Sequence, residues 1–219
     1  MDYADTECGH TATLGGRNLL DSNRKGQDMN RMKREDGATL VEMAFVLPVL
    51  ILLIFGSVEF GLAFKERLTV ASAASSAGRT GATMGTRAEA DIRILEAIEV
   101  GLYDQVDVGV IVSVEIFKAD PVTGINVGPS NTYTFDGLDP TCKWIPCPDP
   151  VSPSFAYGGT WTPDTRDTEL NPGGGGLDVL GVEVIYHHTP VTNILTYLDR
   201  DFTERALVRL EPDVFGTSP

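Results

Sequence analysis

The feature that most constrains the fold of this chain is an apolar run of 22 residues, Met43 to Phe64, which holds one charged residue, Glu59. A helix rises about 1.5 Å per residue, so a run of this length covers roughly 33 Å and can cross the hydrocarbon core of a bilayer. A lone segment in lipid must satisfy its backbone hydrogen bonds internally, and only a helix does so. We therefore predict a transmembrane helix and assign residues 38–64 to it.

A cleaved secretory signal peptide is the alternative for such a run. Its apolar region is typically about 7–15 residues long and ends in small residues at the cleavage site. Here the run is longer, and Lys65, Glu66 and Arg67 follow it directly. We therefore favour a membrane segment that is retained.

The flanking charges predict the orientation. The positive-inside rule places the basic N-terminal flank in the cytoplasm, which makes the chain a single-pass protein of the cytoplasmic membrane with residues 65–219 outside. The net charge is −14, from 31 acidic and 17 basic residues, and this disfavours nucleic acid, whose phosphates require Lys and Arg. The basic residues upstream of the run are Arg24, Lys25, Arg31, Lys33 and Arg34, and those directly downstream are Lys65 and Arg67.

Three residues in or beside the run need an explanation. Pro48 lacks a backbone donor and crowds the preceding turn, so it should kink the helix or free a carbonyl. Glu59, near the outer end, either reaches the interface or pairs with a neighbour. Glu42 stands at the inner boundary, where the simplest explanation is a helix-start carboxylate stabilised by the helix dipole.

The start of the run resembles the N-terminus of TadE-like proteins, a minor-pilin or pseudopilin family of the tight-adherence branch of type IV pilus systems. The likeness is carried by the charged segment Lys33 to Gly37, by the sequence ATLVEMA from Ala38 to Ala44, and by the apolar run with Pro48. It is close over residues 33–80 and looser at the far C-terminus.

The resemblance implies a processing site and a set of partners. In such proteins a prepilin peptidase cuts after a Gly that ends the leader, and Glu is the fifth residue of the mature chain. Cleavage between Gly37 and Ala38 would make Glu42 the fifth residue. It would also create an ammonium group that a carboxylate of a neighbouring subunit can neutralise, in a setting where unpaired charges are costly. We expect Glu42, Pro48 and Glu59 to serve assembly. The implied partners are other pilins or pseudopilins, the prepilin peptidase, the inner-membrane pilus platform and membrane lipid.

The leader, residues 1–37, departs from this pattern in length. Such leaders are often short, and Met32 begins a compact charged leader of its own. Residues 1–31 are rich in Gly, Asn and Asp without clear periodicity, which predicts disorder. They are either an over-extended start or a cytoplasmic tail.

Residues 65–104 are predicted to form a helical stem and an amphipathic helix. The small residues of the segment 71–78 allow close helix packing, and we interpret them as a stem that packs against other pilin helices. The glycines at 78, 81 and 85 either weaken this helix or end it. Apolar residues recur at helical spacing between Ala88 and Leu102, although Asp91 and Glu99 narrow the apolar face.

Residues 105–219 are predicted to form a β-rich exterior domain. Its segments are rich in β-branched residues and are separated by turn signals. Strands that follow a leading helix indicate an α+β fold with an antiparallel sheet, and the resemblance to pilins implies the same layout. The expected strands are Val108–Phe117, Asn131–Phe135, Leu177–His187 and Thr203–Leu210.

A Pro- and Gly-rich loop, residues 136–176, interrupts this sheet. Loops of such length are often functional or disordered. Its aromatic residues Trp144, Tyr157 and Trp161 either form an exposed recognition surface or pack the loop onto the sheet. Cys142 and Cys147 supply too few ligands for a structural zinc, so in an oxidising exterior we expect a disulfide, with two free thiols as the alternative.

The remaining residues do not indicate enzymatic chemistry. His187 and His188 are adjacent on a predicted strand, so they face opposite sides and cannot easily bind one ion. Asp164, Asp167 and Glu169 suit calcium as ligand types, but their spacing matches no EF-hand loop. We expect no metal, no cofactor and no enzyme. The sequence favours a structural minor pilin, and the alternative is an unprocessed single-pass anchor whose exterior domain binds a ligand or a surface.

Overall fold

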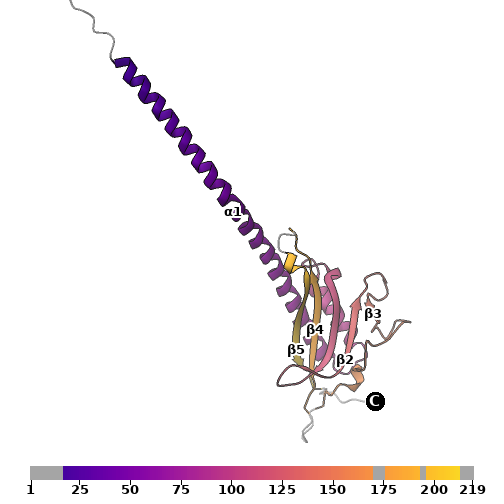
Figure 1. Cartoon of the computed structure of the whole chain (residues 1–219). Coiled ribbons are helices and arrows are strands. Elements are labelled where there is room, and N and C mark those ends of the chain that lie inside the picture. The colour runs from indigo at the N-terminus through magenta and orange to yellow at the C-terminus, as the bar shows by residue number, and fades with distance from the viewer. Residues whose placement is uncertain (1–16, 170–175, 193–195, 213–219) are drawn as a thin grey trace, which may run out of the picture. The chain divides into compact units, whose positions relative to one another are not determined.

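A computed structural model describes the backbone of residues 17–169, 176–192 and 196–212, and the side chains of these ranges from Gly37 onward. The chain forms two compact units, Met1–Ile54 and Phe55–Pro219, and the second is called the C-terminal unit below. Helix α1 (Arg17–Met84) has residues in both units (Figure 1). The C-terminal unit adds helix α2 (Ala90–Leu102) and a β-sheet.

Helix α1 is longer than the sequence predicts. It begins at Arg17, so residues 17–31 are helical where we expect disorder, and residues 1–16 lie outside the described residues. No proline precedes Pro48, and each residue added to an existing helix gains a hydrogen bond, so the helix extends readily. At the other end α1 stops at Met84, and Gly85 follows with a φ of +55°, a conformation that glycine adopts without strain.

The part of α1 from Gly37 to Met84 is the one helix among the described residues that is long and apolar enough to cross a membrane. Its most apolar window has a mean hydropathy of 2.5, and none of that window is buried within the chain. The side chains of residues 37–55 are all exposed. An apolar surface of this extent fits a helix whose surroundings are lipid and not a protein core.

The described strands form one antiparallel sheet in the order β3-β2-β1-β4-β5 (Figure 1). The predicted α+β class, with a long apolar helix, a second helix and an antiparallel sheet, is confirmed. The four predicted strands are present with shifted ends, and the two-residue strand β3 inside the loop 136–176 was not predicted. The strands are β1 (Ile111–Ala119), β2 (Asn126–Phe135), β3 (Trp144–Ile145), β4 (Val179–His188) and β5 (Arg200–Arg209).

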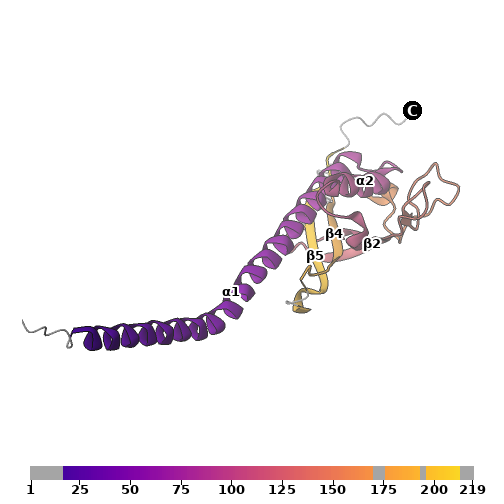
Figure 2. The same cartoon turned by 90° about the horizontal axis from the view of Figure 1, so that it is seen from above.

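The core lies between the helices and one face of the sheet, and Figure 2 shows α2 beside the C-terminal part of α1. Small residues allow this close packing. A Cβ at Gly101 of α2 would lie 2.8 Å from the Cβ of Ala73 in α1, and one at Gly81 would lie 2.5 Å from Leu180 of β4. Ala73, Ala74 and Ala77 of the stem are buried within the chain, whereas Ser72 and Ser76 are exposed. Packing of the stem against other pilin helices stays a prediction for its exposed residues.

Candidate functional site

The residues that the sequence assigns to processing and assembly lie along one helix. Gly37, Ala38, Glu42 and Pro48 all belong to α1, and the side chains of this segment are exposed. A Cβ at Gly37 would meet nothing of the described chain within 4 Å. Ala38 and Glu42 are four residues apart, which places them on the same helix face about 6 Å apart along the axis. No side chain described from Gly37 onward therefore covers Ala38 or the Glu42 carboxylate.

Glu59 occupies a different setting, because its carboxylate is completely buried. The backbone N–H of Val191 donates to Oε2 at 3.1 Å, and the hydroxyl of Thr192 donates to Oε1 at 2.5 Å. The backbone N–H of Thr192 also donates to Oε1. Both oxygens of Glu59 are thus bound by two consecutive residues of the β4–β5 loop, within the same chain.

A cavity of about 220 Å³ lies between α1, from Phe60 to Arg67, and the adjoining ends of β4 and β5. The buried side chain of His188 borders it, with Nδ1 hydrogen-bonded to the Glu66 carboxylate. Its Nε2 atom has no hydrogen-bond partner among the described residues. The remaining wall is largely aromatic and includes Phe60, Phe64, Tyr186 and Phe202.

His187 points away from His188 and is exposed. Its Nδ1 lies 2.8 Å from Asp201 and its Nε2 lies 3.0 Å from Asp199. The hydrogen bond to Asp201 is the largest of the causes that raise the pKa of His187 above its ordinary value of 6.5, burial lowers the pKa by less than this, and the hydrogen bond to Asp199 raises it further. Within the described parts of the chain no group of three or more His, Cys, Asp or Glu side chains could hold a metal ion, and the acidic residues 164, 167 and 169 form no such group.

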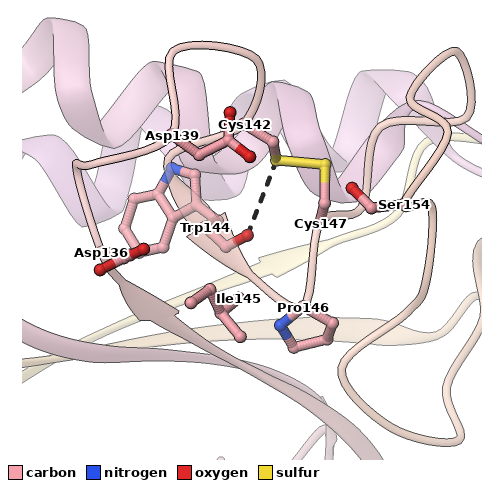
Figure 3. Close-up of a pocket in the computed structure, with 8 residues that line it drawn as sticks. All are labelled: Asp136, Asp139, Cys142, Trp144, Ile145, Pro146, Cys147 and Ser154. Atoms are coloured by element: carbon pink, nitrogen blue, oxygen red, sulfur yellow. Dashed lines mark hydrogen bonds between the residues drawn. A yellow bond between two sulfur atoms is a disulfide. The ribbon is translucent and has the colours of Figure 1, made fainter.

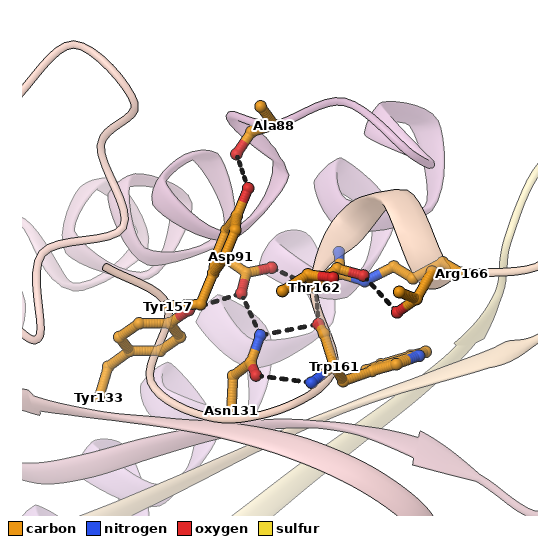
Figure 4. A network of polar contacts seen from close by, with 9 residues as sticks. Ala88, Asp91, Asn131, Tyr133, Tyr157, Trp161, Thr162 and Arg166 are labelled. Atoms are coloured by element: carbon orange, nitrogen blue, oxygen red, sulfur yellow. Dashed lines mark hydrogen bonds and ion pairs between the residues drawn. The ribbon is translucent and has the colours of Figure 1, made fainter. Parts of the chain in front are cut away.

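The carboxylate of Asp91 organises a buried polar network (Figure 4). Asn131 and Tyr133 of β2 both donate to its Oδ2, at 2.7 and 2.6 Å, and the Arg166 guanidinium forms an ion pair with its Oδ1. Burial first, and then the Asp91 charge, raises the pKa of the Tyr133 phenol well above its ordinary value. A single helix residue thus joins α2, strand β2 and the long loop.

The same network fastens the loop at Trp161. Asn131 donates to the Trp161 carbonyl at 2.8 Å and accepts from the Trp161 N–H at 3.0 Å. The Arg166 guanidinium lies 4.7 Å from the centre of the Trp161 ring. A cation over an aromatic face is an attractive arrangement, and here both groups are buried.

Glu99, the second carboxylate of α2 near the apolar face, holds the other end of the loop. It accepts from the Trp144 indole N–H at 2.8 Å and from Lys143 at 2.6 Å. The structure joins Cys142 and Cys147 in a disulfide with a Cα–Cα distance of 5.8 Å, beside a cavity of about 270 Å³ (Figure 3). Loop residues 136–169 are therefore attached to α2 through Asp91 and Glu99 and to β2 through Asn131, while the disulfide closes a small ring within the loop.

This arrangement decides between the two expectations for the loop aromatics. Trp144 and Trp161 are each about 1% exposed, so they pack the loop onto the domain. Tyr157 is half-buried and donates to the Ala88 carbonyl at 3.2 Å. The prediction that these rings form an exposed recognition surface is therefore wrong for the two tryptophans. Asp91 and Glu99 were missed as anchors, and the signal for them was a carboxylate near the apolar stripe of α2.

Comparison with known proteins gives one match. Residues 37–79 match the family model described as TadE-like protein. Neither a curated protein nor a solved structure matches the chain. The match falls on the exposed apolar part of α1 and its continuation into the C-terminal unit, and it contains Gly37, Ala38, Glu42, Pro48 and Glu59. The chain therefore carries a TadE-like segment over residues 37–79.

Proposed function

We propose that this protein is a structural minor pilin or pseudopilin of a tight-adherence, type IVb-like pilus. The observation that carries the proposal is the TadE-like match over residues 37–79, which begins at Gly37 and includes Glu42. A family of pilus-associated proteins suggests a structural role and not an enzymatic one. The chain would be anchored in the cytoplasmic membrane by α1, with its N-terminus in the cytoplasm and its C-terminal unit outside.

Assembly would begin with cleavage by a prepilin peptidase after Gly37. The new ammonium group on Ala38 then needs a counter-charge, because an unpaired charge next to lipid is costly. Glu42 on the exposed face of a neighbouring subunit's helix can supply it. Such a pair would fix the register of one helix against the next at the inner-membrane pilus platform. Pro48, one and a half turns further along, would adapt the helix to its neighbours.

Glu59 would contribute to assembly indirectly. Its carboxylate is already bound by Val191 and Thr192, so it is not available to another subunit in this conformation. We propose that it shapes the subunit at the outer end of the apolar run. Glu42, directly before the apolar run, is then the carboxylate that is exposed for contacts between subunits.

The alternative, an unprocessed anchor with an exterior binding domain, has less support. A recognition surface would be expected on the long loop, but its two tryptophans are buried and its described residues are fastened by the Asp91 network and the disulfide. These contacts make the loop a part of the packed domain.

Processing can be tested with a pair of matched glycine variants. Gly37→Ala should abolish cleavage in cells that contain the prepilin peptidase, as seen by intact mass of the membrane-extracted protein. Gly61→Ala is the control, since Gly61 lies in the same helix and a Cβ there also meets nothing of the described chain within 4 Å. Neither variant strains the fold, so normal cleavage of Gly37→Ala would refute the proposed site.

Assembly can be tested separately with Glu42→Gln, which removes the charge and keeps the shape. The variant should be cleaved normally but lost from the sheared pilus fraction and from co-purification with other pilins. Glu89→Gln, at an exposed carboxylate of the C-terminal unit, is the control. Incorporation of Glu42→Gln at the level of this control would contradict the proposed pairing.

A further inference from the structure

We propose that the described residues on the two sides of the β4–β5 loop, 189–192 and 196–199, form a second membrane contact, which inserts Val191 and Tyr197 into the outer interface of the lipid bilayer. The surface consists of these two residues together with Phe60 and Phe64 of α1, and is called the lipid-contact surface below. The proposal rests on α1 spanning a membrane, and not on any role of the chain in a pilus.

The first step of the argument is the depth of Glu59. The apolar run extends five residues beyond it, to Phe64, which corresponds to about 7.5 Å of helix. The predicted transmembrane segment 38–64 covers roughly 40 Å, about 10 Å more than a bilayer core requires, so each of its ends lies near a boundary of the hydrocarbon. Glu59, five residues before the outer end, therefore lies at or near the outer boundary.

The second step is that the loop is fixed at this depth. The Val191 N–H and the Thr192 N–H both bind the Glu59 carboxylate, the former at 3.1 Å. On the far side of the loop, the Tyr197 ring lies 6.4 Å from that of Phe60, measured between centroids. Two separate parts of the loop thus meet α1 within one turn of Glu59. Since Glu59 lies at the boundary of the hydrocarbon, the loop lies there too.

The third step is the chemistry of the exposed side chains. Val191 is 72% exposed and Tyr197 is 57% exposed, and the Tyr197 ring lies beside that of Phe60, which is itself more than half exposed. Aromatic residues with one polar end are enriched where the bilayer meets water. The lipid-contact surface is therefore continuous with the lipid-facing surface of the apolar run.

The fourth step is the charge around this surface. Lys65 follows Phe64 in α1 and Arg200 begins β5, and both are exposed, so these long cationic side chains can reach lipid phosphates. The Arg200 guanidinium lies 5.0 Å from the centre of the Phe202 ring, which also lines the cavity beside α1. The nearby carboxylates are already paired: Glu66 with His188, Glu204 with Arg67, and Asp199 and Asp201 with His187. His187 carries at most one positive charge against the two carboxylates of Asp199 and Asp201, so this part of the surface is not basic.

The occupant of this surface is therefore lipid, with acyl chains against the rings and phosphates against Lys65 and Arg200. A second protein copy could also cover apolar residues, but depth alone already places the loop at the membrane boundary. The loop would tie the C-terminal unit to the membrane at a second point, and so limit rotation of the unit about the axis of α1.

The test is the depth of nitroxide labels on the full-length chain in vesicles of phosphatidylcholine and phosphatidylglycerol. Single cysteines are introduced at Val191, Tyr197, Leu62 and Val122 in a Cys8→Ser background, with the Cys142–Cys147 disulfide left intact. Collisions with oxygen report lipid, and collisions with a water-soluble nickel chelate report water. Leu62 is the reference for the membrane span, and Val122, which is 90% exposed in the β1–β2 turn, is the reference for water.

We expect labels at 191 and 197 to resemble the label at 62, with more oxygen contact and less nickel contact than at 122. Nickel contact at 191 and 197 equal to that at 122 overturns the proposal while leaving the membrane span intact. Protection from both reagents indicates a protein partner and also overturns it. A water-exposed label at 62 shows that the span ends before it, which removes the depth argument and with it the proposal, whatever the other labels show.

Discussion

At the scale of single residues, the buried carboxylate of Asp91 is the position where the smallest change should do the most damage. Its ion pair with Arg166 is sealed from water, and removing one member of such a pair typically costs about 3–5 kcal/mol because the other charge stays buried. Asp91→Asn should therefore lower the free energy of unfolding by about this amount. Urea unfolding of the detergent-solubilised chain, followed by the fluorescence of Trp144 and Trp161, measures it.

Asp164→Asn is the matched control, since Asp164 is an exposed carboxylate of the same loop. Exposed substitutions usually change stability by less than about 0.5 kcal/mol. If Asp91→Asn were as stable as this control, the Asp91 network would not hold the loop as described.

His187 gives a prediction about pH. Its folded-state pKa is raised above 6.5 by Asp201 and then by Asp199. The charged form is therefore favoured by folding, so its contribution to stability is complete below pH 6.5 and is lost as the pH rises through the folded-state pKa. An NMR titration of the imidazole should show a pKa above 6.5, which Asp201→Asn lowers more than Asp199→Asn does. A pKa at or below 6.5 in the unaltered chain would contradict these contacts.

The residues that carry these contacts could be named from the sequence only in part. Gly37, Ala38 and Glu42 follow from a local motif, because the spacing that matters is a few residues. The roles of Glu59 and Asp91 do not follow from the sequence, because their hydrogen-bond donors are remote. Thr192 is 133 residues from Glu59, and Arg166 is 75 residues from Asp91. A carboxylate among apolar residues indicates that hydrogen-bond donors will surround it in the fold, but the sequence does not show which residues supply them.

At the scale of elements, the contact between α1 and the β4–β5 loop depends on one carboxylate. Hydrogen bonds to a charged group contribute about 1.5–3 kcal/mol each, and 1.4 kcal/mol corresponds to a factor of ten. Glu59→Gln should therefore speed hydrogen exchange at the Val191 and Thr192 amides on the order of tenfold. Glu42→Gln, on the same helix, should leave both amides unchanged. Equal exchange in all three proteins would show that Glu59 does not hold the loop.

The contact between α1 and α2 depends on Gly101, which has no side chain and so allows the two helices to approach closely. A Cβ at Gly101 would lie 2.9 Å from the backbone Cα of Ala73, so the two helices would have to separate. Gly101→Ala should destabilise the chain by about 1–3 kcal/mol, as overpacking usually does, and should lower its thermal midpoint in detergent. Gly61→Ala, where a Cβ meets nothing of the described chain within 4 Å, should show no such loss. Similar midpoints for the two variants would mean that the helices pack less closely.

Most elements could be predicted because their patterns are local. β-branched residues mark β1 and β4, and apolar residues at helical spacing mark α2. Strand β3 has two residues, Trp144 and Ile145, and exists because it pairs with the end of β2, which no local pattern reveals. The small residues of α1 predicted close packing, but their partners, α2 and β4, follow only from the tertiary fold.

At the scale of the whole molecule, one helix serves two environments. Residues 37–55 of α1 are exposed and apolar, whereas Val70, Ala73 and Ala77 are buried against the sheet and α2. The membrane-spanning part of α1 can be predicted from composition alone, since a segment in lipid requires only apolar side chains and a helix that satisfies its own backbone hydrogen bonds. The TadE-like match covers both parts, from Gly37 to Arg79, so the family resemblance extends from the membrane segment into the folded unit.

The measurement that tests the central claim most directly is the identity of the N-terminal residue after extraction from membranes that contain the prepilin peptidase. Cleavage after Gly37 predicts a chain that begins at Ala38, with Glu42 as its fifth residue. Intact mass and N-terminal sequencing both report this. A membrane-embedded chain that keeps its leader, and begins at Met1 or Met32, would contradict the proposed pilin and support an unprocessed membrane anchor.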